Sequence, residues 1–174
     1  MSFATALFLV LRVAHVLLAA TWLGATAFVA LFLMPSAEDA GPAAGPIMGA
    51  LVRRKLPVFM AAIGGTVVVT GLYLYWRFTG GFDPALSGTR AAMVFGTGGI
   101  SGIAALIVGG VVVSRNAKKM AAVAARLPSV AEGPERAVLV GDMNAARRKA
   151  AGGARIVLAL QAIALAAMAI GHYV

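Results

Sequence analysis

Histidine is the residue type in this chain best suited to bind a metal or a haem, and there are two, His15 and His172. Neutral imidazole is the commonest metal ligand, and haem iron is often held by histidine. Thioether sulfur suits haem iron or Cu(I), so Met93 and Met168 are further candidate metal ligands. The alternative interpretation of both methionines is packing, because methionine fills irregular cores.

His15 belongs to a polar stripe on the first apolar segment, which runs from Phe3 to Met34. Residues spaced by three or four share one helix face. The face consists of Thr5, Phe8, Arg12, His15, Ala19, Trp22 and Thr26. Polar groups in such a segment are expensive in hydrocarbon and turn inward, so the stripe is predicted to face the inside of a helix bundle. Two alternatives stay open: His15 forms only a hydrogen bond, and Arg12 extends to the membrane surface.

The composition is that of an integral membrane protein. Of 174 residues, 61% are hydrophobic and 12% are charged, against roughly 45–50% and 25% in soluble domains. The absence of cysteine excludes disulfides and thiolate metal sites. All six acidic residues fall in loops, which excludes a membrane-buried carboxylate that relays protons. The sequence also contains no phosphate-binding glycine loop and no serine-histidine-aspartate set, so no catalytic residue is assigned.

Four apolar runs are each long enough to cross a bilayer. We predict an all-α, four-helix membrane bundle that forms a single transmembrane domain, residues 1–174. The expected spans are about 3–34, 56–76, 91–113 and 154–173, the first of them ended by Pro35. A helical hairpin is expected over about 114–153, with its turn at Pro128 to Pro134 and a kink at Gly152-Gly153. A short interfacial helix is expected from Ile47 to Lys55.

The loop charges predict the orientation. Loops with an excess of Lys and Arg stay in the cytoplasm. The third loop is the most basic, with Arg115, Lys118, Lys119, Arg126, Arg136, Arg147, Arg148, Lys149 and Arg155. Both termini are therefore expected outside. The net charge of +9 follows from these loops and indicates contact with membrane lipids, not with nucleic acid.

Counting residues along the first and fourth helices predicts that the two histidines lie at a similar depth in the membrane. If Ala154 is level with Ala30, a rise of about 1.5 Å per residue places His172 near the level of residue 12, one turn from His15. One helix face of the fourth span contains Gln161, Leu165, Met168 and His172. One helix face of the second span contains Thr66, Thr70, Tyr73 and Arg77. Arg12 and Arg77 could then receive haem propionates. The alternative for His172 is a location in the wet interface.

The first span also resembles a known family. Its motif is Leu11-Arg12-x-x-His15, followed after six residues by Trp22-Leu23-Gly24. This resembles the opening helix of the copper-resistance protein D-like group and of the haem-dependent membrane protoporphyrinogen oxidase group. The run Gly71-Leu72-Tyr73-Leu74-Tyr75 resembles small four-helix bacterial relatives. The resemblance implies a multi-pass protein of the bacterial inner (plasma) membrane, with an outer-leaflet site built on His15.

Two functions are consistent with these observations. The first is a small membrane protein that binds haem b or copper through His15 and His172, for electron transfer or metal handling. The second is a cofactor-free accessory subunit of a larger membrane complex, or a homo-oligomer, whose Gly- and Ala-rich faces pack against partners. A transporter is least favoured, since a four-span unit would have to oligomerise to build a pathway.

Overall fold

The chain folds into four long helical stretches. The computed structural model describes residues 2–174 apart from the side chain of Pro42, and no strand occurs among them. Each stretch is long and apolar enough to cross a membrane. In chain order their helices are α1 (Phe3–Phe28) with α2 (Met34–Asp39), α4 (Leu56–Phe78), α6 (Arg90–Val108) with α7 (Ser114–Arg126), and α8 (Pro134–Ile170). The predicted all-α, four-helix membrane fold is confirmed.

The first stretch continues past the proline that was expected to end it. Between α1 and α2, Val29–Leu33 forms a π-helical segment in which the N–H of Met34 bonds to the carbonyl of Val29. A proline inside an α-helix lacks an N–H and clashes with the carbonyl four residues earlier. The wider π turn directly before Pro35 relieves both problems, and the stretch runs on to Asp39. The predicted end at Pro35 was therefore wrong.

Short elements connect the spans at their ends. A 3-10 turn, Gly41–Ala44, leads into α3 (Gly45–Arg53), which begins and ends two residues before the helix predicted from Ile47 to Lys55. Lys55, with a φ of 60°, makes the left-handed corner before α4. At the other end of the bundle, α5 (Pro84–Ser87) follows Asp83. The Asp83 carboxylate accepts the N–H groups of the first turn of α5.

The third and fourth stretches extend together beyond the other two as a helical hairpin. A π-helical segment, Gly109–Val113, joins α6 to α7, and the chain turns before Pro134. No break occurs at Gly152-Gly153, where α8 is continuous. A Cβ at Gly153 would lie 2.9 Å from Val112 Cγ1, so this glycine permits close helix contact instead of a kink. Three ion pairs bridge residues of the hairpin: Lys119–Asp142, Arg126–Glu135 and Arg136–Glu132.

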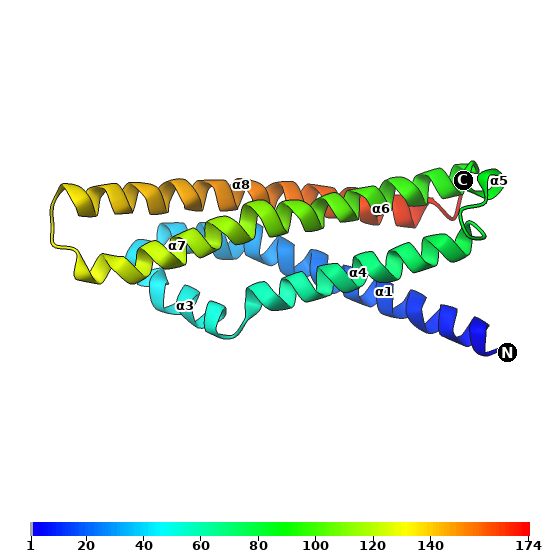
Figure 1. Cartoon of the computed structure of the whole chain (residues 1–174), viewed down its shortest axis with the longest axis horizontal. Coiled ribbons are helices and arrows are strands. Elements are labelled where there is room, and N and C mark those ends of the chain that lie inside the picture. Colours follow the sequence, from blue (N-terminus) through cyan, green and yellow to red (C-terminus); the bar gives the residue numbers. More distant parts are fainter. Residues whose placement is uncertain (1) are drawn as a thin grey trace.

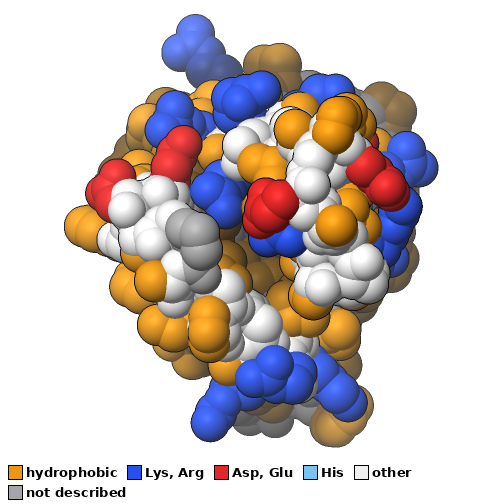
Figure 2. All heavy atoms as spheres, turned by 90° about the vertical axis from the view of Figure 1, so that its left-hand side faces the viewer, with side chains coloured by type: hydrophobic (Ala, Val, Ile, Leu, Met, Phe, Trp, Pro, Cys, Tyr) orange, Lys and Arg blue, Asp and Glu red, His pale blue; other side chains and the backbone are white. Residues whose placement is uncertain are grey.

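The spans form a closed ring. Helix α1 packs against α4 and α8, α4 packs against α6, and α6 packs against α8. Figure 1 shows both termini and α5 at one end of the bundle and the hairpin turn at the other. Figure 2 views the hairpin end, where Lys and Arg side chains surround the rim. The basic end is thus opposite the termini, as the predicted orientation requires; which end faces the cytoplasm stays a prediction.

The packed core lies at mid-height and takes a residue from every span. Trp22 of α1, Ile63 and Val67 of α4, Ala105 of α6 and Val157 of α8 form one buried cluster. Large apolar side chains elsewhere face outward, among them Val10, Val13, Leu17 and Phe28 of the first stretch. Such a surface suits lipid, in which apolar side chains are not driven inward.

Close approach in this core depends on one glycine. A Cβ at Gly64 would lie 2.8 Å from Trp22 Cζ2 and 3.0 Å from Leu106 Cδ1, whereas a Cβ at Gly65 meets nothing within 4 Å. We expect Gly64→Ala to lower stability by about 1–3 kcal/mol through overpacking. Gly65→Ala, the matched control, should not be destabilised. Thermal unfolding in detergent measures the difference, and equal melting temperatures would contradict this account of the core.

Candidate functional site

A cavity of about 480 Å³ opens among all four spans, in the half of the bundle that holds the termini. Its size is that of a small-molecule site, for which roughly 300–1,000 Å³ is usual. The walls are mainly apolar, and α6 contributes several glycines to them. The lining residues with polar or sulfur atoms are Arg12, His15, Trp22, Tyr75, Gln161, Met168 and His172.

The tautomer of His15 follows from its hydrogen bond to α4. Its Nδ1 lies 3.0 Å from Thr70 Oγ1. The hydroxyl of Thr70 also lies 2.7 Å from the carbonyl of Thr66 and 3.1 Å from that of Val67. Because its shortest contact is with the Thr66 carbonyl, we assign Thr70 as the acceptor and His15 Nδ1–H as the donor. The lone pair of the imidazole is consequently on Nε2, which has no hydrogen-bond partner within residues 2–174.

Gly71 makes room for this ring. A Cβ at Gly71 would lie 2.9 Å from His15 Cε1. Any side chain there would displace the imidazole, so the glycine lets the ring lie directly against the backbone of α4. The Thr70–Gly71 pair thus fixes both the position and the protonation of His15. A metal-binding histidine is commonly oriented in this way, through a hydrogen bond from its other ring nitrogen.

His172 has a different environment. Arg12 Nη2 lies 2.8 Å from His172 Nε2, and because arginine can only donate, this nitrogen accepts. The His172 lone pair is therefore engaged by Arg12, and the ring packs edge-on against Phe95, with centroids 5.1 Å apart. The prediction that His172 lies at the level of residue 12 is confirmed. The contact that results is an arginine–histidine pair at the end of the cavity nearest the C-terminus, and its hydrogen bond takes the nitrogen that a metal would need.

Met168 lies one layer further in. Counting inward from the Arg12–His172 pair at about 1.5 Å per residue, His15 is about 4.5 Å deep and Met168 about 6 Å deep. Both line the cavity. The methyl end of Met168 packs at Gly98, where a Cβ would lie 3.1 Å from Met168 Cε. His15 and Met168 therefore belong to the same layer, on α1 and α8 respectively.

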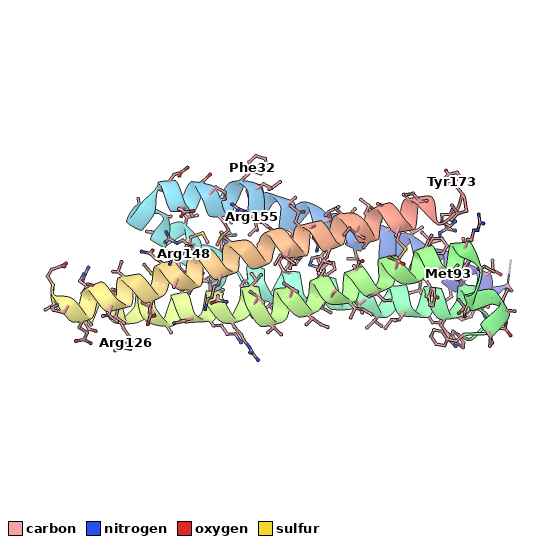
Figure 3. The ribbon with its side chains drawn as sticks, turned by 90° about the horizontal axis from the view of Figure 1, so that it is seen from above. Phe32, Met93, Arg126, Arg148, Arg155 and Tyr173 are labelled. Atoms are coloured by element: carbon pink, nitrogen blue, oxygen red, sulfur yellow. The ribbon has the colours of Figure 1, made fainter. Side chains whose placement is uncertain are left out.

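Two candidate residues are not part of this site. Met93 is 55% exposed and does not line the cavity; Figure 3 shows it at the same end of the bundle as Tyr173. Arg77 is exposed and lies with Trp76, Gly80 and Gly81 at a separate small recess. The inward face of α4 includes Val67, Gly71, Leu74 and Phe78. The face with Thr66 and Arg77 is rotated away from the cavity, so Arg12 alone of the two arginines is placed to meet an anion there.

Sequence reasoning did not assign a role to Gly71 and Gln161, which line the cavity, or to Thr70, which contacts His15. Thr70 and Gln161 each lie on a face that the helical period had identified, but their contacts depend on neighbouring helices. Gly71 gives no signal by itself in a chain with 21 glycines. The signal that could have found Gln161 is its chemistry, because it is an uncharged polar residue in the middle of an apolar span.

Among residues 2–174, no group of three or more His, Cys, Asp or Glu side chains is arranged to hold a metal ion. Comparison of the chain with protein-family models, with characterised proteins and with solved structures gives no match. Fold and cavity together define the class: a multi-pass, all-α membrane protein with a mainly apolar cavity that is lined by two histidines, His15 and His172.

Proposed function

We propose that the protein binds haem b in this cavity, where His15 Nε2 would hold the iron, and acts in electron transfer. The observation that carries the proposal is the His15–Thr70 hydrogen bond, at 3.0 Å. It holds the proton on Nδ1 and leaves the Nε2 lone pair available, which is the form of histidine that binds iron.

The cavity suits haem in size and polarity. A volume of about 480 Å³ with apolar walls and one basic group at one end matches a flat apolar macrocycle that has two carboxylates on one edge. Arg12 is placed to bind those carboxylates, since charge-assisted bonds from arginine are strong. Met168 is in the same layer as His15 and would be a second residue able to hold the iron, since thioether sulfur also binds haem iron.

The donor set favours haem over copper. Haem iron already has four nitrogens from the macrocycle, so one or two protein ligands suffice. A copper ion would depend on protein donors alone, and here His172 is bonded to Arg12. His15 and Met168 would then be the remaining soft or nitrogen donors on the cavity wall.

When bound, haem would supply one-electron redox chemistry. The chain's own residues would position it and exclude water. His15, held by Thr70, would provide the nitrogen that binds the iron, and Arg12 would bind the anionic edge. Trp22, 6% exposed, would close the inner end. Purified protein should show a Soret band and contain iron by metal analysis. Stoichiometric copper without a Soret band would overturn the proposal, as would a colourless, metal-free protein that fails to take up added haem.

A second test addresses the orientation of His15. We expect Thr70→Val to weaken haem binding by about 10–100-fold and to shift the Soret maximum, because it removes the acceptor that fixes the His15 tautomer. Thr66→Val is the matched control. Thr66 lies one turn away, donates to the carbonyl of Ala62 in the same manner and is exposed. Haem titrations followed by absorbance measure both. If the two variants behave alike, Thr70 does not position the ligand.

A further inference from the structure

The basic residues of the chain are not spread evenly along the bundle. Of the 15 Lys and Arg residues, the hairpin pairs Lys119, Arg126 and Arg136 with carboxylates. A further group lies at the base of the hairpin and has no acidic partner within residues 2–174. We call this group the basic collar, and it consists of Arg115, Lys118, Arg147, Arg148, Lys149 and Arg155.

Helix α4 shows where the hydrocarbon layer ends. Its 23 residues are about 35 Å long, close to the roughly 30 Å of a typical bilayer core. Leu56, its first residue, therefore lies near one border of that core. Because a Cβ at Gly64 would lie 3.0 Å from Leu106 Cδ1, these two residues are at one level. Counting equally from both toward the hairpin, the border passes near Ser114, the first residue of α7.

The collar lies at this border. A Cβ at Gly153 would lie 2.9 Å from Val112 Cγ1, so Ser114 is level with about residue 151 of α8. Counted from there at about 1.5 Å per residue, the collar extends from Arg155, about 6 Å inside the border, to Arg147, about 6 Å outside it. Headgroups add roughly 5–7 Å on each side of the hydrocarbon core. Most of the collar is thus at the level of the lipid phosphates.

The ion pairs of the hairpin begin where the collar ends. Lys119 directly follows Lys118 and pairs with Asp142 at 3.4 Å, further out on α8. Arg126, about 18 Å beyond the border, pairs with Glu135. The hairpin therefore supplies carboxylates to its cations in the aqueous region and supplies none to those in the headgroup layer. The partner of the collar has to come from outside the described chain.

Two collar residues form a pair suited to a phosphate-bearing headgroup. Arg148 and Arg155 are both exposed and, being seven residues apart, share one face of α8; Figure 3 shows both on this helix. An unpaired arginine is costly in hydrocarbon, and its long side chain can extend to the headgroups. The other acidic residues at this end, Glu38 and Asp39, form no ion pair with the collar within residues 2–174.

The charge of the collar decides which headgroup fits. A zwitterionic headgroup has its own cation beside the phosphate, which the collar repels, whereas an anionic phospholipid offers the phosphate alone. We infer that the basic collar binds anionic phospholipid in the leaflet at the hairpin end, in preference to zwitterionic phospholipid, and that Arg148 and Arg155 contact its headgroup. This surface is separate from the haem cavity, which lies in the half of the bundle that holds the termini.

The test is a lipid competition on the full-length protein in detergent. Phosphatidylglycerol and phosphatidylcholine with identical acyl chains are added together, and native mass spectrometry counts the molecules of each that stay bound. Phosphatidylglycerol should bind about tenfold more tightly at low salt, since each cation near the surface adds to the attraction. The preference should weaken in high salt, because salt screens exposed charges.

The double variant Arg148→Gln/Arg155→Gln should lower this preference at least about threefold. Lys119→Gln/Arg126→Gln is the matched control, because it removes the same charge from exposed residues that already have carboxylate partners. It should keep the preference of the parent protein. An equal loss in both variants would show that net charge alone attracts the lipid and would overturn the inference. So would equal binding of the two lipids to the parent protein, or displacement of phosphatidylglycerol by an equal concentration of glycerol phosphate, which would identify a site for a soluble anion.

Discussion

His15→Ala should abolish the Soret band of the haem-loaded protein, whereas His172→Ala should retain it. The two histidines differ in the use of Nε2. At His15 this nitrogen keeps a free lone pair because Nδ1 donates to Thr70, while at His172 it accepts from Arg12 at 2.8 Å. Loss of a metal ligand should exceed the 10–100-fold loss that follows removal of a supporting residue, so we expect affinity to fall by more than about a hundredfold.

The matched variant, His172→Ala, tests whether this difference in hydrogen bonding determines which histidine binds the iron. In His172→Ala, Arg12 loses its acceptor but stays free to bind a carboxylate, so affinity should change by less than about tenfold. Absorbance titrations of both purified variants, with circular dichroism to verify helix content, measure the outcome. An equally large loss in His172→Ala would show that both imidazoles bind the iron. An intact Soret band in His15→Ala would refute the site.

The fold could be predicted because each span corresponds to one continuous apolar run in the sequence. An apolar run of about 20 residues must form a helix in lipid, since every backbone group has to be satisfied internally. The helix ends were less predictable. Pro35 is a stop signal by its own chemistry, and the π turn at Val29–Leu33 that lets the helix continue has no marker among those residues.

The site was predictable only where one helix determined it. In the first span the polar residues are few, so their helical spacing identified the face with Arg12 and His15. The second span has a polar face with Thr66 and Arg77, but this face is turned away from the cavity. Its rotation is set by close contacts at Gly64 and Gly71 with residues of α1, which lie far away in sequence. Arg77 was assigned to the site because this rotation could not be seen.

Pairing across helices was the hardest feature to predict. Depth counting correctly placed His172 beside residue 12, but depth does not reveal which nitrogen bonds to which donor. The hydrogen bond from Arg12 occupies the Nε2 atom of His172, which was a candidate metal ligand. Likewise, Thr70 gains its role only because His15 lies against it. Sequence alone therefore identified the helix face that lines the cavity, but not the contacts that its residues make with the other helices.

Gly99→Leu should eliminate haem binding while leaving the fold as stable as before or more so. Gly99 lines the cavity, and a Cβ there would meet nothing within 4 Å, so a larger side chain can extend into open space. Replacing glycine in a helix interior is favourable by up to about 1 kcal/mol. The leucine would occupy volume that the macrocycle needs. Stability and binding should thus change in opposite directions, which a general folding defect cannot produce.

Gly65→Leu is the matched control for this substitution. It also gains helix propensity, its Cβ also meets nothing within 4 Å, and Gly65 does not line the cavity. Haem titration and thermal unfolding in the same detergent should show normal binding in Gly65→Leu and none in Gly99→Leu, with neither variant melting below the parent protein. If Gly99→Leu took up haem with unchanged affinity, the ligand would have to bind elsewhere. The cavity would then be a gap left by loose packing between the spans, and not the haem-binding site.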